Sequence, residues 1–348
     1  MKIQLDKSLF FSRTMDFLEV YLPQTHESAK TKKTYQDGLT IFRRYVTDTK
    51  GLSIKTFKFN DCTFDFVLKY RNWLTDTQKR KNSTVNNRLA AIKAYLRYAS
   101  DMDITLAQVF LNVQDVPFLK TPKEIRPILE EDVLADLLDA PPNTKTGVRD
   151  TMILSMLFDT MIRADELLRM DVNDIQYKLS SPYILVHGKG NKERTVPMSD
   201  KLITLVEAYM AEFHGTEILD KDGSNPFIYT TIHDTCHRMS ERNLERIVKK
   251  YADIVREKHP EMPSSVYPHM FRRTRGTGMY REGIPVEAIA VAMGHASIQT
   301  TKDHYAFPSL DQKKETMDKG NGLVISRNDA EREYPEDEAE LARICGIR

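Results

Sequence analysis

The sequence is short of the features that mark secreted, membrane or disulfide-rich proteins. Only 3 of its 348 residues are cysteine, and they lie far apart at Cys62, Cys236 and Cys345. An odd number of separated cysteines argues against a disulfide framework and for a reducing compartment. Its apolar runs are too short to cross a bilayer or to form the hydrophobic part of a signal peptide. We therefore expect a cytoplasmic protein with no membrane partner.

Ligand sets for a metal or a nucleotide are also missing. His233, Cys236 and His237 lie close together, but no second pair of ligands stands at zinc-finger spacing, so we expect no metal. The glycines at 188–190 flank a lysine as GKG, which lacks the spacing of a phosphate-binding loop. We expect no cofactor.

Net charge is nearly absent at +1, but it is unevenly distributed. Residues 1–113 contain 19 basic and 11 acidic side chains, a net charge of +8. Residues 309–348 contain 7 basic and 10 acidic side chains, a net charge of −3. A basic first third is typical of a domain that grips a phosphate backbone, although chance asymmetry remains an alternative.

Helical periodicity dominates what is present. The length favours two domains, and 41% hydrophobic residues is ordinary for a globular protein. Two sets of side chains recur at the spacing of one helix face: Tyr35, Leu39, Phe42 and Tyr45, and then Val85, Leu89, Ile92 and Leu96. We expect Ser83 or Thr84 to be the N-cap of the second helix.

The opposite face of this second helix is polar and basic, and a basic run precedes it. A solvated face is the usual explanation of such residues, whereas a helix laid along a DNA groove is the functional one. The basic run slightly favours DNA. The candidate DNA-binding residues are Lys79, Arg80, Lys81, Arg88, Lys93 and Arg97.

The chain divides into four parts. Residues 1–113 read as a helical domain, and residues 114–128 contain three prolines that favour an extended linker. A second domain over 129–308 begins with acidic residues in the first turn of a helix, where the helix dipole favours them. Within it, Tyr183–His187 and the segment from Arg194 predict a β-hairpin, and helical patterns return from about 201 to 305. Residues 309–348 form an acidic tail.

Four separated segments of the second domain carry residues suited to phosphate chemistry. They are TMIRADELL from Thr160, GKGNKER from Gly188, HMFR from His269, and MGH from Met293, which continues through two threonines to Tyr305. Each is common by itself. All four in this order, with a hairpin between two helical blocks, make the chain resemble the tyrosine recombinase (phage integrase) family.

The resemblance implies a fold and an activity. The fold would be mainly α with a small β-hairpin or sheet: an N-terminal helical core-binding domain and a mixed α/β catalytic domain of tyrosine recombinase type. The activity would be site-specific recombination of double-stranded DNA through a 3′-phosphotyrosyl intermediate, by a homotetramer on paired DNA sites and through a Holliday junction. The family's catalytic residues match Arg163, Lys189, His269, Arg272, His295 and Tyr305.

The chemistry of these side chains fits such a reaction. Attack on a phosphodiester places charge on the non-bridging oxygens, which the guanidinium forks of Arg163 and Arg272 can bind bidentately without a metal. His269 shares a helix face with Arg272. In the family the hairpin lysine, Lys189, is the general acid for the leaving 5′-oxygen, with Lys192 on the same turn as its rival.

The remaining two residues take their roles from the resemblance. His295 would orient or hydrogen-bond the phosphate. His269 would help to deprotonate Tyr305, because a phenol with a pKa near 10 attacks poorly at neutral pH. Glu166 either positions the arginines or is a surface acid, and both explanations stay open.

The sequence departs from the family pattern at a few positions. Met161 stands where the family usually has glycine, which implies a less flexible turn. Tyr305-Ala306-Phe307 replaces the common Tyr-x-His. Tyr267 and Tyr280 are rival tyrosines, but neither follows a segment of the GH…TT kind. The chain starts close to its helical domain, so we expect no separate arm-binding domain.

Two further alternatives are left open by the sequence. The segment Glu336–Cys345 is compatible with a short amphipathic helix. It is either a solvated end or, as in the family, a segment that docks on a neighbouring protomer. The alternative function is a non-catalytic DNA-binding or architectural protein on the same fold, which would form no covalent adduct with DNA.

Overall fold

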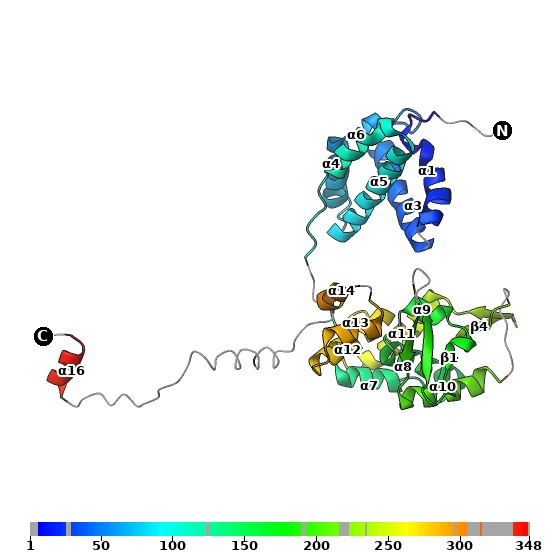
Figure 1. Cartoon of the computed structure of the whole chain (residues 1–348), viewed down its shortest axis with the longest axis vertical. Coiled ribbons are helices and arrows are strands. Elements are labelled where there is room, and N and C mark those ends of the chain that lie inside the picture. The colour runs from blue at the N-terminus through cyan, green and yellow to red at the C-terminus, as the bar shows by residue number, and fades with distance from the viewer. Residues whose placement is uncertain are drawn as a thin grey trace. The chain divides into compact units, whose positions relative to one another are not determined.

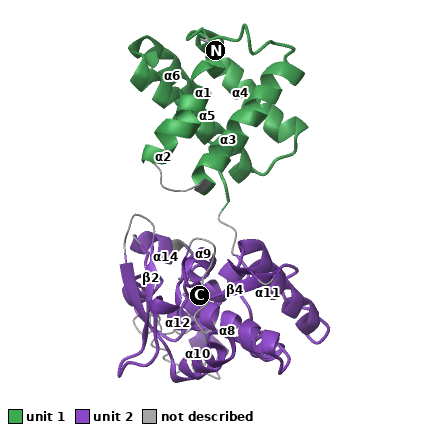
Figure 2. Cartoon of the chain, turned by 90° about the vertical axis from the view of Figure 1, so that its right-hand side faces the viewer, with its two compact units in different colours: residues 1–125 green, residues 126–348 purple. Residues whose placement is uncertain are grey.

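The structure is a computed structural model that describes residues 6–25, 29–122, 126–188, 193–215, 223–233, 235–295, 297–304, 314 and 337–346. The chain divides into two compact units, residues 1–125 and 126–348 (Figure 2). Both are mainly helical, and the second also contains small antiparallel sheets, which confirms the expected fold class. Within the described ranges, no helix is long and apolar enough to cross a membrane.

In the described part of the first unit, the named elements are all helices or helical turns (Figure 1). Its α-helices are α1 (Thr14–Asp16), α2 (Leu22–Thr25), α3 (Ala29–Arg44), α4 (Phe64–Asn72), α5 (Asn82–Met102) and α6 (Ala107–Gln114). Short 3₁₀ turns are η1 (Phe10–Arg13), η4 (Phe59–Asp61) and η6 (Ile104–Leu106), and π-helical turns are η2 (Phe17–Tyr21), η3 (Tyr45–Thr49) and η5 (Trp73–Thr77).

Helices α3 and α5 form the centre of this unit. Their predicted apolar faces are confirmed, because seven of the eight side chains are buried and Tyr35 packs against the same core. The helices approach closely at Gly38, where a Cβ atom would lie 2.5 Å from the Cβ of Ala91. The ring of Phe10 fills the core between them, 5.2 Å from the ring of Phe42 and 5.3 Å from that of Tyr95.

The predicted N-cap of α5 was wrong. The N-cap is Lys81, whose carbonyl accepts hydrogen bonds from the amides of Thr84 and Val85, and no side chain caps the helix. The chain reaches Lys81 through Lys79, which has a left-handed φ of 50°. This turn starts the helix at Asn82, three residues before the first apolar position, so Ser83 and Thr84 already lie inside it.

The second unit has a core of its own, and most of its elements are helices. They are α7 (Glu131–Asp139), α8 (Lys145–Asp159), α9 (Ala164–Arg169), η7 (Val172–Asp174), α10 (Asp200–Phe213), α11 (Glu241–Arg256), α12 (Pro268–Arg281), α13 (Val286–Met293), α14 (Ile298–His304) and, in the tail, α16 (Glu338–Ile344). The strands are β1 (Ile175–Gln176), β2 (Tyr183–His187), β3 (Glu193–Pro197), β4 (Tyr229–Ile232) and β5 (Thr235–Arg238).

The predicted hairpin is confirmed as β2 and β3, which pair antiparallel and are joined on one side by β1. Ile184, Val186 and Val196 are buried in the core of the unit. The last pair of the ladder is His187 with Glu193.

A second hairpin replaces part of the expected helical stretch between 201 and 305. Strands β4 and β5 pair antiparallel, and His233 in their turn has a φ of 47°. Arg238 at the end of β5 donates to the carbonyl of Met170 at 2.9 Å and pairs with Asp171 at 2.6 Å. The hairpin thus holds the C-terminal end of α9, the helix that begins after Arg163.

The expected tail helix is present as α16. The carboxylate of Asp337 caps it by accepting the backbone N–H of Ala339 at 3.1 Å. None of its side chains is buried. Its docking on a neighbouring protomer stays a prediction.

Candidate active site

The turn before Arg163 adopts an unusual conformation. Helix α8 ends at Asp159, and Met161 then takes a left-handed φ of 53°. This conformation costs a non-glycine residue about 1–2 kcal/mol. Met161 nevertheless suits the position, because its side chain is 4% exposed and packs with Ile289 and Met293. Burial of a methionine side chain stabilises by about 1.5–3 kcal/mol, which offsets the strain.

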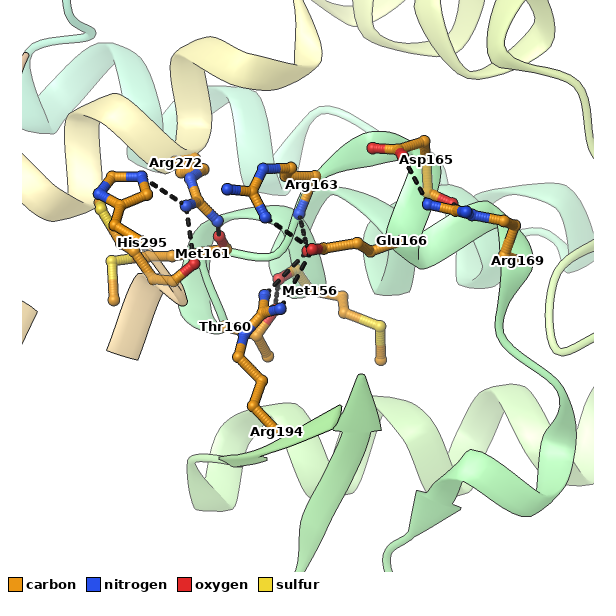
Figure 3. A network of polar contacts seen from close by, with 11 residues as sticks. Met156, Thr160, Met161, Arg163, Asp165, Glu166, Arg169, Arg194, Arg272 and His295 are labelled. Carbon is orange, nitrogen blue, oxygen red and sulfur yellow. Dashed lines mark hydrogen bonds and ion pairs between the residues drawn. The ribbon is translucent and has the colours of Figure 1, made fainter. Parts of the chain in front are cut away.

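Arg163 is the N-cap of α9 and is held by Glu166. Its backbone N–H and its Nη1 donate to the two carboxylate oxygens, at 2.8 and 2.7 Å. Arg194 on β3 reaches the same carboxylate from the opposite side with a two-pronged contact of 3.1 and 2.8 Å (Figure 3). The Glu166 side chain is 2% exposed, while that of Arg163 is 39% exposed. Glu166 therefore positions Arg163 from the buried side and leaves part of its guanidinium accessible to solvent.

The ionisation of Glu166 follows from its partners. Burial alone would raise the pKa of this carboxyl group. The hydrogen bonds from Arg194 and from the Arg163 backbone, together with the charges of both arginines, outweigh burial and bring the pKa to about 2. Glu166 is a carboxylate at any working pH, and the surface-acid explanation of it is wrong.

Helix α12 supplies Arg272. Pro268 occupies the first turn of α12, as expected from its fixed φ and missing N–H. The Arg272 side chain is almost completely buried and donates to the carbonyl of Met161, to the carbonyl of Met293 at 2.8 Å and to His295 Nε2 at 2.9 Å (Figure 3). Arg272 thus ties the turn that leads to Arg163 to the segment that carries His295.

The hydrogen bonds of His295 fix its tautomer. An arginine can only donate, so Nε2 of His295 accepts from Arg272 and carries no proton. Nδ1 is 2.8 Å from the hydroxyl of Thr301, which is fully buried on α14. In a neutral imidazole Nδ1 then holds the proton and donates it to this hydroxyl. Thr301 therefore orients His295 from the helix that directly precedes Tyr305.

His269 lies in the first turn of α12, where its side chain is partly covered by protein and partly exposed. The protein packed around the imidazole, followed by the positive charges of Arg272, Arg273, Arg126 and Arg163, lowers its pKa to about 4. His269 is therefore neutral at physiological pH and can accept a proton.

This neutral histidine predicts a flat pH profile. A histidine with the ordinary pKa of 6.5 gains a proton as the pH falls from 8 to 6, whereas His269 does so only near pH 4. The second-order rate constant for covalent adduct formation with DNA should therefore change by about twofold or less over this range. Initial rates at low DNA concentration measure it. An inflection near pH 6.5 that persists in a His295→Gln protein would contradict a neutral His269.

Four of the six catalytic candidates thus come together in the second unit. Arg272 contacts His295 and the Met161 carbonyl next to Ile162 and Arg163, and both arginines act on His269. Lys189, its rival Lys192, and Tyr305 lie outside the described residues, as do Ala306 and Phe307. The described residues resume at Glu193 after Gly188, and one described range stops at His304, one residue before Tyr305.

The DNA-binding candidates of the first unit differ in availability. Lys79, Arg80, Lys81 and Arg97 are exposed, whereas Arg88 is half-buried and donates to the Thr34 carbonyl at 3.4 Å.

The ammonium of Lys93 is bound by groups of its own domain. Its ammonium donates to the carbonyls of Gln114 and Val116 at 2.9 and 2.6 Å and lies over the ring of Phe118. Burial lowers its pKa. This lysine caps the end of α6, and its ammonium is already bound within the domain, so we do not propose it as a DNA contact.

Two arginines of the site were not among the candidates. The sequence marks Arg194 only as part of the hairpin. Arg273 donates to the carbonyl of Pro127 at 3.0 Å and to the hydroxyl of Tyr267 at 3.1 Å, and so fixes the start of the unit on α12. Its position next to Arg272 was the only sequence signal. No described group of His, Cys, Asp or Glu side chains has the arrangement of a metal site.

Comparison with known proteins identifies the family. The model of the phage integrase family matches residues 127–310, which is more than half of the chain, and that of the phage integrase SAM-like domain matches residues 14–114. The chain belongs to the phage integrase family of tyrosine recombinases. The resemblance found in the sequence is thereby confirmed. Family membership supports site-specific recombination of DNA as its activity.

Relatives within the family match most of the chain. Tyrosine recombinase XerC of Staphylococcus epidermidis is 25% identical over 289 residues, which cover 82% of this chain and 89% of that protein. XerC of Staphylococcus haemolyticus is 27% identical over 287 residues, with 82% and 89% covered.

Solved structures show the same fold. The Tn1549 transposon integrase in complex with a circular intermediate DNA has a TM-score of 0.65 and 16% identity, covering 91% of this chain and 99% of that one. The XerH site-specific recombinase bound to a palindromic difH substrate has a TM-score of 0.63 and 16% identity, covering 83% and 79%.

Proposed function

We propose that this chain is a site-specific DNA recombinase of the integrase, transposase or resolvase type that cuts and rejoins double-stranded DNA through a 3′-phosphotyrosyl bond at Tyr305. The observation that carries the proposal is the convergence of Arg163, His269, Arg272 and His295 from separate segments on one place in the second unit. This set of side chains suits phosphoryl transfer at a phosphodiester. It combines two guanidiniums with one neutral imidazole and a second imidazole whose tautomer is fixed.

The reaction proceeds in one displacement at phosphorus. The oxygen of Tyr305 attacks the scissile phosphate and its proton passes to His269, which is neutral and able to accept it. The bond from phosphorus to the 5′-oxygen breaks, and Lys189 gives that oxygen a proton. Strand joining reverses these steps, so the bond energy is conserved and neither ATP nor a metal is needed.

The two arginines bind the phosphate differently. Arg163 is accessible and offers its fork directly to the non-bridging oxygens. Arg272 is buried and uses three of its five N–H groups on acceptors within the protein, so it meets the phosphate with at most two donors unless one of these contacts is exchanged. When Arg272 turns to the phosphate, His295 is released from it. The His295 proton then moves from Nδ1 to Nε2, where it can be donated to a phosphate oxygen, and the Thr301 hydroxyl reverses its role by donating to Nδ1.

Domain roles follow from this chemistry. Residues 1–113 grip the DNA, residues 114–128 link the domains, residues 129–308 catalyse, and the tail from 309 to 348 docks on a neighbouring protomer. Four protomers assemble on two paired DNA sites and exchange strands through a Holliday junction.

A covalent adduct is the decisive test. A DNA site nicked close to the cleavage position loses a short fragment after attack, which traps the protein on the DNA and makes it visible by denaturing electrophoresis. The alternative, a non-catalytic DNA-binding protein on the same fold, would shift the DNA in a native gel but give no adduct.

The general acid can be tested by changing the leaving group. A Lys189→Ala protein should cleave ordinary DNA about 10²–10⁴-fold more slowly, because the 5′-oxygen leaves without a proton. A substrate with sulfur at the bridging 5′ position leaves as a thiolate and should restore the rate to within about tenfold of the unmodified protein. If only Lys192→Ala is rescued by the sulfur substrate, the acid is Lys192.

Salt dependence tests the DNA clamp. Replacing Lys79, Arg80 and Lys81 together with alanine should weaken binding at all sequences. The slope of log affinity against log salt should fall by roughly 0.9 for each phosphate that the variant no longer neutralises. The matched control is Lys69→Ala, which removes an exposed lysine already paired with Asp65 at 2.6 Å. Equal slopes for the triple variant and the control would place the DNA contacts elsewhere.

A further inference from the structure

Arg194 stands where three functional segments of the second unit meet. It lies on β3, five residues after Lys189 in the sequence. Its Nη1 and Nη2 bind both oxygens of Glu166, at 3.1 and 2.8 Å, and Glu166 in turn binds Arg163 (Figure 3). Its side chain is 17% exposed, which removes it from direct competition with Arg163 for DNA.

The same guanidinium packs against the segment of His295. Gly294 ends α13 with a left-handed φ of 64°, and a Cβ atom there would lie 2.7 Å from Cδ and Nε of Arg194 and 2.9 Å from Cζ. Glycine is required at this position both by the backbone conformation and by the arginine beside it. Arg194 therefore touches the chain immediately before His295.

The charges of the network decide how strongly Arg163 can bind a phosphate. One carboxylate, almost fully buried, is shared between two guanidiniums, which leaves the three groups with a net charge of +1. Without Arg194, Glu166 and Arg163 would form a neutral pair. Both carboxylate oxygens would then be available to hold the Arg163 guanidinium toward the protein and away from a phosphate.

We propose that Arg194 is a positioning residue for strand cleavage, which keeps Arg163 available to the scissile phosphate by satisfying Glu166 and which joins strand β3 to the segment that carries His295. This inference rests on the proposed recombinase function. It assigns a role in catalysis to a residue that makes no contact with the reacting atoms.

The first test compares two neighbouring arginines and separates cleavage from DNA binding. Arg194→Met preserves the length of the side chain and removes its charge. The matched control is Arg169→Met on α9, where Arg169 forms an exposed pair with Asp165 at 2.6 Å and does not contact Glu166 (Figure 3). At saturating protein on a nicked DNA site, we expect Arg194→Met to form adduct about 10- to 100-fold more slowly than the unchanged protein. Losses of this size are typical when a residue that orients a functional group, without touching the substrate, is removed. The affinity of Arg194→Met for a half-site and the rate of the control should stay within about twofold of the unchanged protein.

The second test separates an effect through the charge of Arg163 from a general loss of structure. A scissile phosphate with a methyl group in place of one non-bridging oxygen carries no charge and depends less on a guanidinium. The rate ratio between unchanged and Arg194→Met protein should therefore be several-fold smaller on this methylphosphonate than on ordinary DNA. A merely structural defect would give the same ratio on both substrates, and that result would overturn the proposal.

A third variant covers the case in which Arg194→Met does not fold. Arg194→Lys keeps a positive charge next to Glu166 but loses the planar guanidinium. We therefore expect a smaller loss of cleavage rate than in Arg194→Met, and again a smaller rate ratio of unchanged to variant protein on the methylphosphonate than on ordinary DNA. The proposed role of Arg194 would be rejected by two results together. Arg194→Lys would cleave as fast as Arg169→Lys, and the rate ratio of unchanged to Arg194→Lys protein would be equal on ordinary DNA and on the methylphosphonate. The absence of any adduct with the unchanged protein would instead refute the proposed function, so the two failures are distinguishable.

Discussion

A Tyr305→Phe protein is expected to bind its DNA site with unchanged affinity and to form no covalent adduct. The substitution removes one oxygen, the proposed nucleophile, and the remaining groups cannot form the bond to phosphorus. The rate of adduct formation should fall by about 10⁴-fold or more, as expected when a nucleophile is deleted from an otherwise intact site. Native gels report binding, and denaturing gels of a nicked, radiolabelled site report the adduct.

Matched controls come from the rival tyrosines of the same unit. Tyr280→Phe on α12 and Tyr267→Phe each remove one phenolic oxygen and should leave the adduct in place. Loss of the Tyr267 hydroxyl also removes one acceptor of Arg273, so a small decrease in stability is expected there. An adduct that survives in Tyr305→Phe but disappears in Tyr280→Phe would move the nucleophile to α12.

The sequence predicted those elements whose side chains alternate clearly between core and solvent. The faces of α3 and α5 and the hairpin of β2 and β3 follow apolar periods of about 3.6 and 2 residues. The sequence did not predict strands β4 and β5, because their side chains are half-buried or exposed along both strands and the apolar period is therefore weak. Their turn also lacks glycine at the left-handed position, which His233 occupies instead.

Sequence motifs predicted the catalytic candidates, but they did not predict the residues that hold these candidates in place. Arg194 and Val196 alternate with exposed residues along β3, so a charged residue on the buried face could have signalled a buried partner. The identity of that partner, Glu166 on another element, depends on tertiary packing. Lys93 shows the opposite case, since a basic residue on a polar helix face turned out to bind carbonyls that only the folded chain brings near.

Replacement of the two catalytic arginines by lysine is the second change with a large expected effect. A point ammonium cannot reproduce two parallel hydrogen bonds to phosphate oxygens. Arg163→Lys and Arg272→Lys should each lower the single-turnover cleavage rate by about 10²–10³-fold, as for the loss of one donor to a developing oxyanion. The control is Arg169→Lys, which alters only an exposed ion pair on α9.

The structure predicts that the two variants differ in stability. Arg163 is 39% exposed and bound to one carboxylate, so Arg163→Lys should retain its melting temperature. Arg272 is buried and donates to the carbonyls of Met161 and Met293, which a lysine cannot both reach, so Arg272→Lys should lose about 1–3 kcal/mol of stability. Cleavage rates and thermal melts of the three proteins together separate the roles. If Arg163→Lys cleaves at nearly the normal rate while remaining folded, then the accessible guanidinium does not stabilise the transition state, and the phosphate must bind elsewhere on this unit.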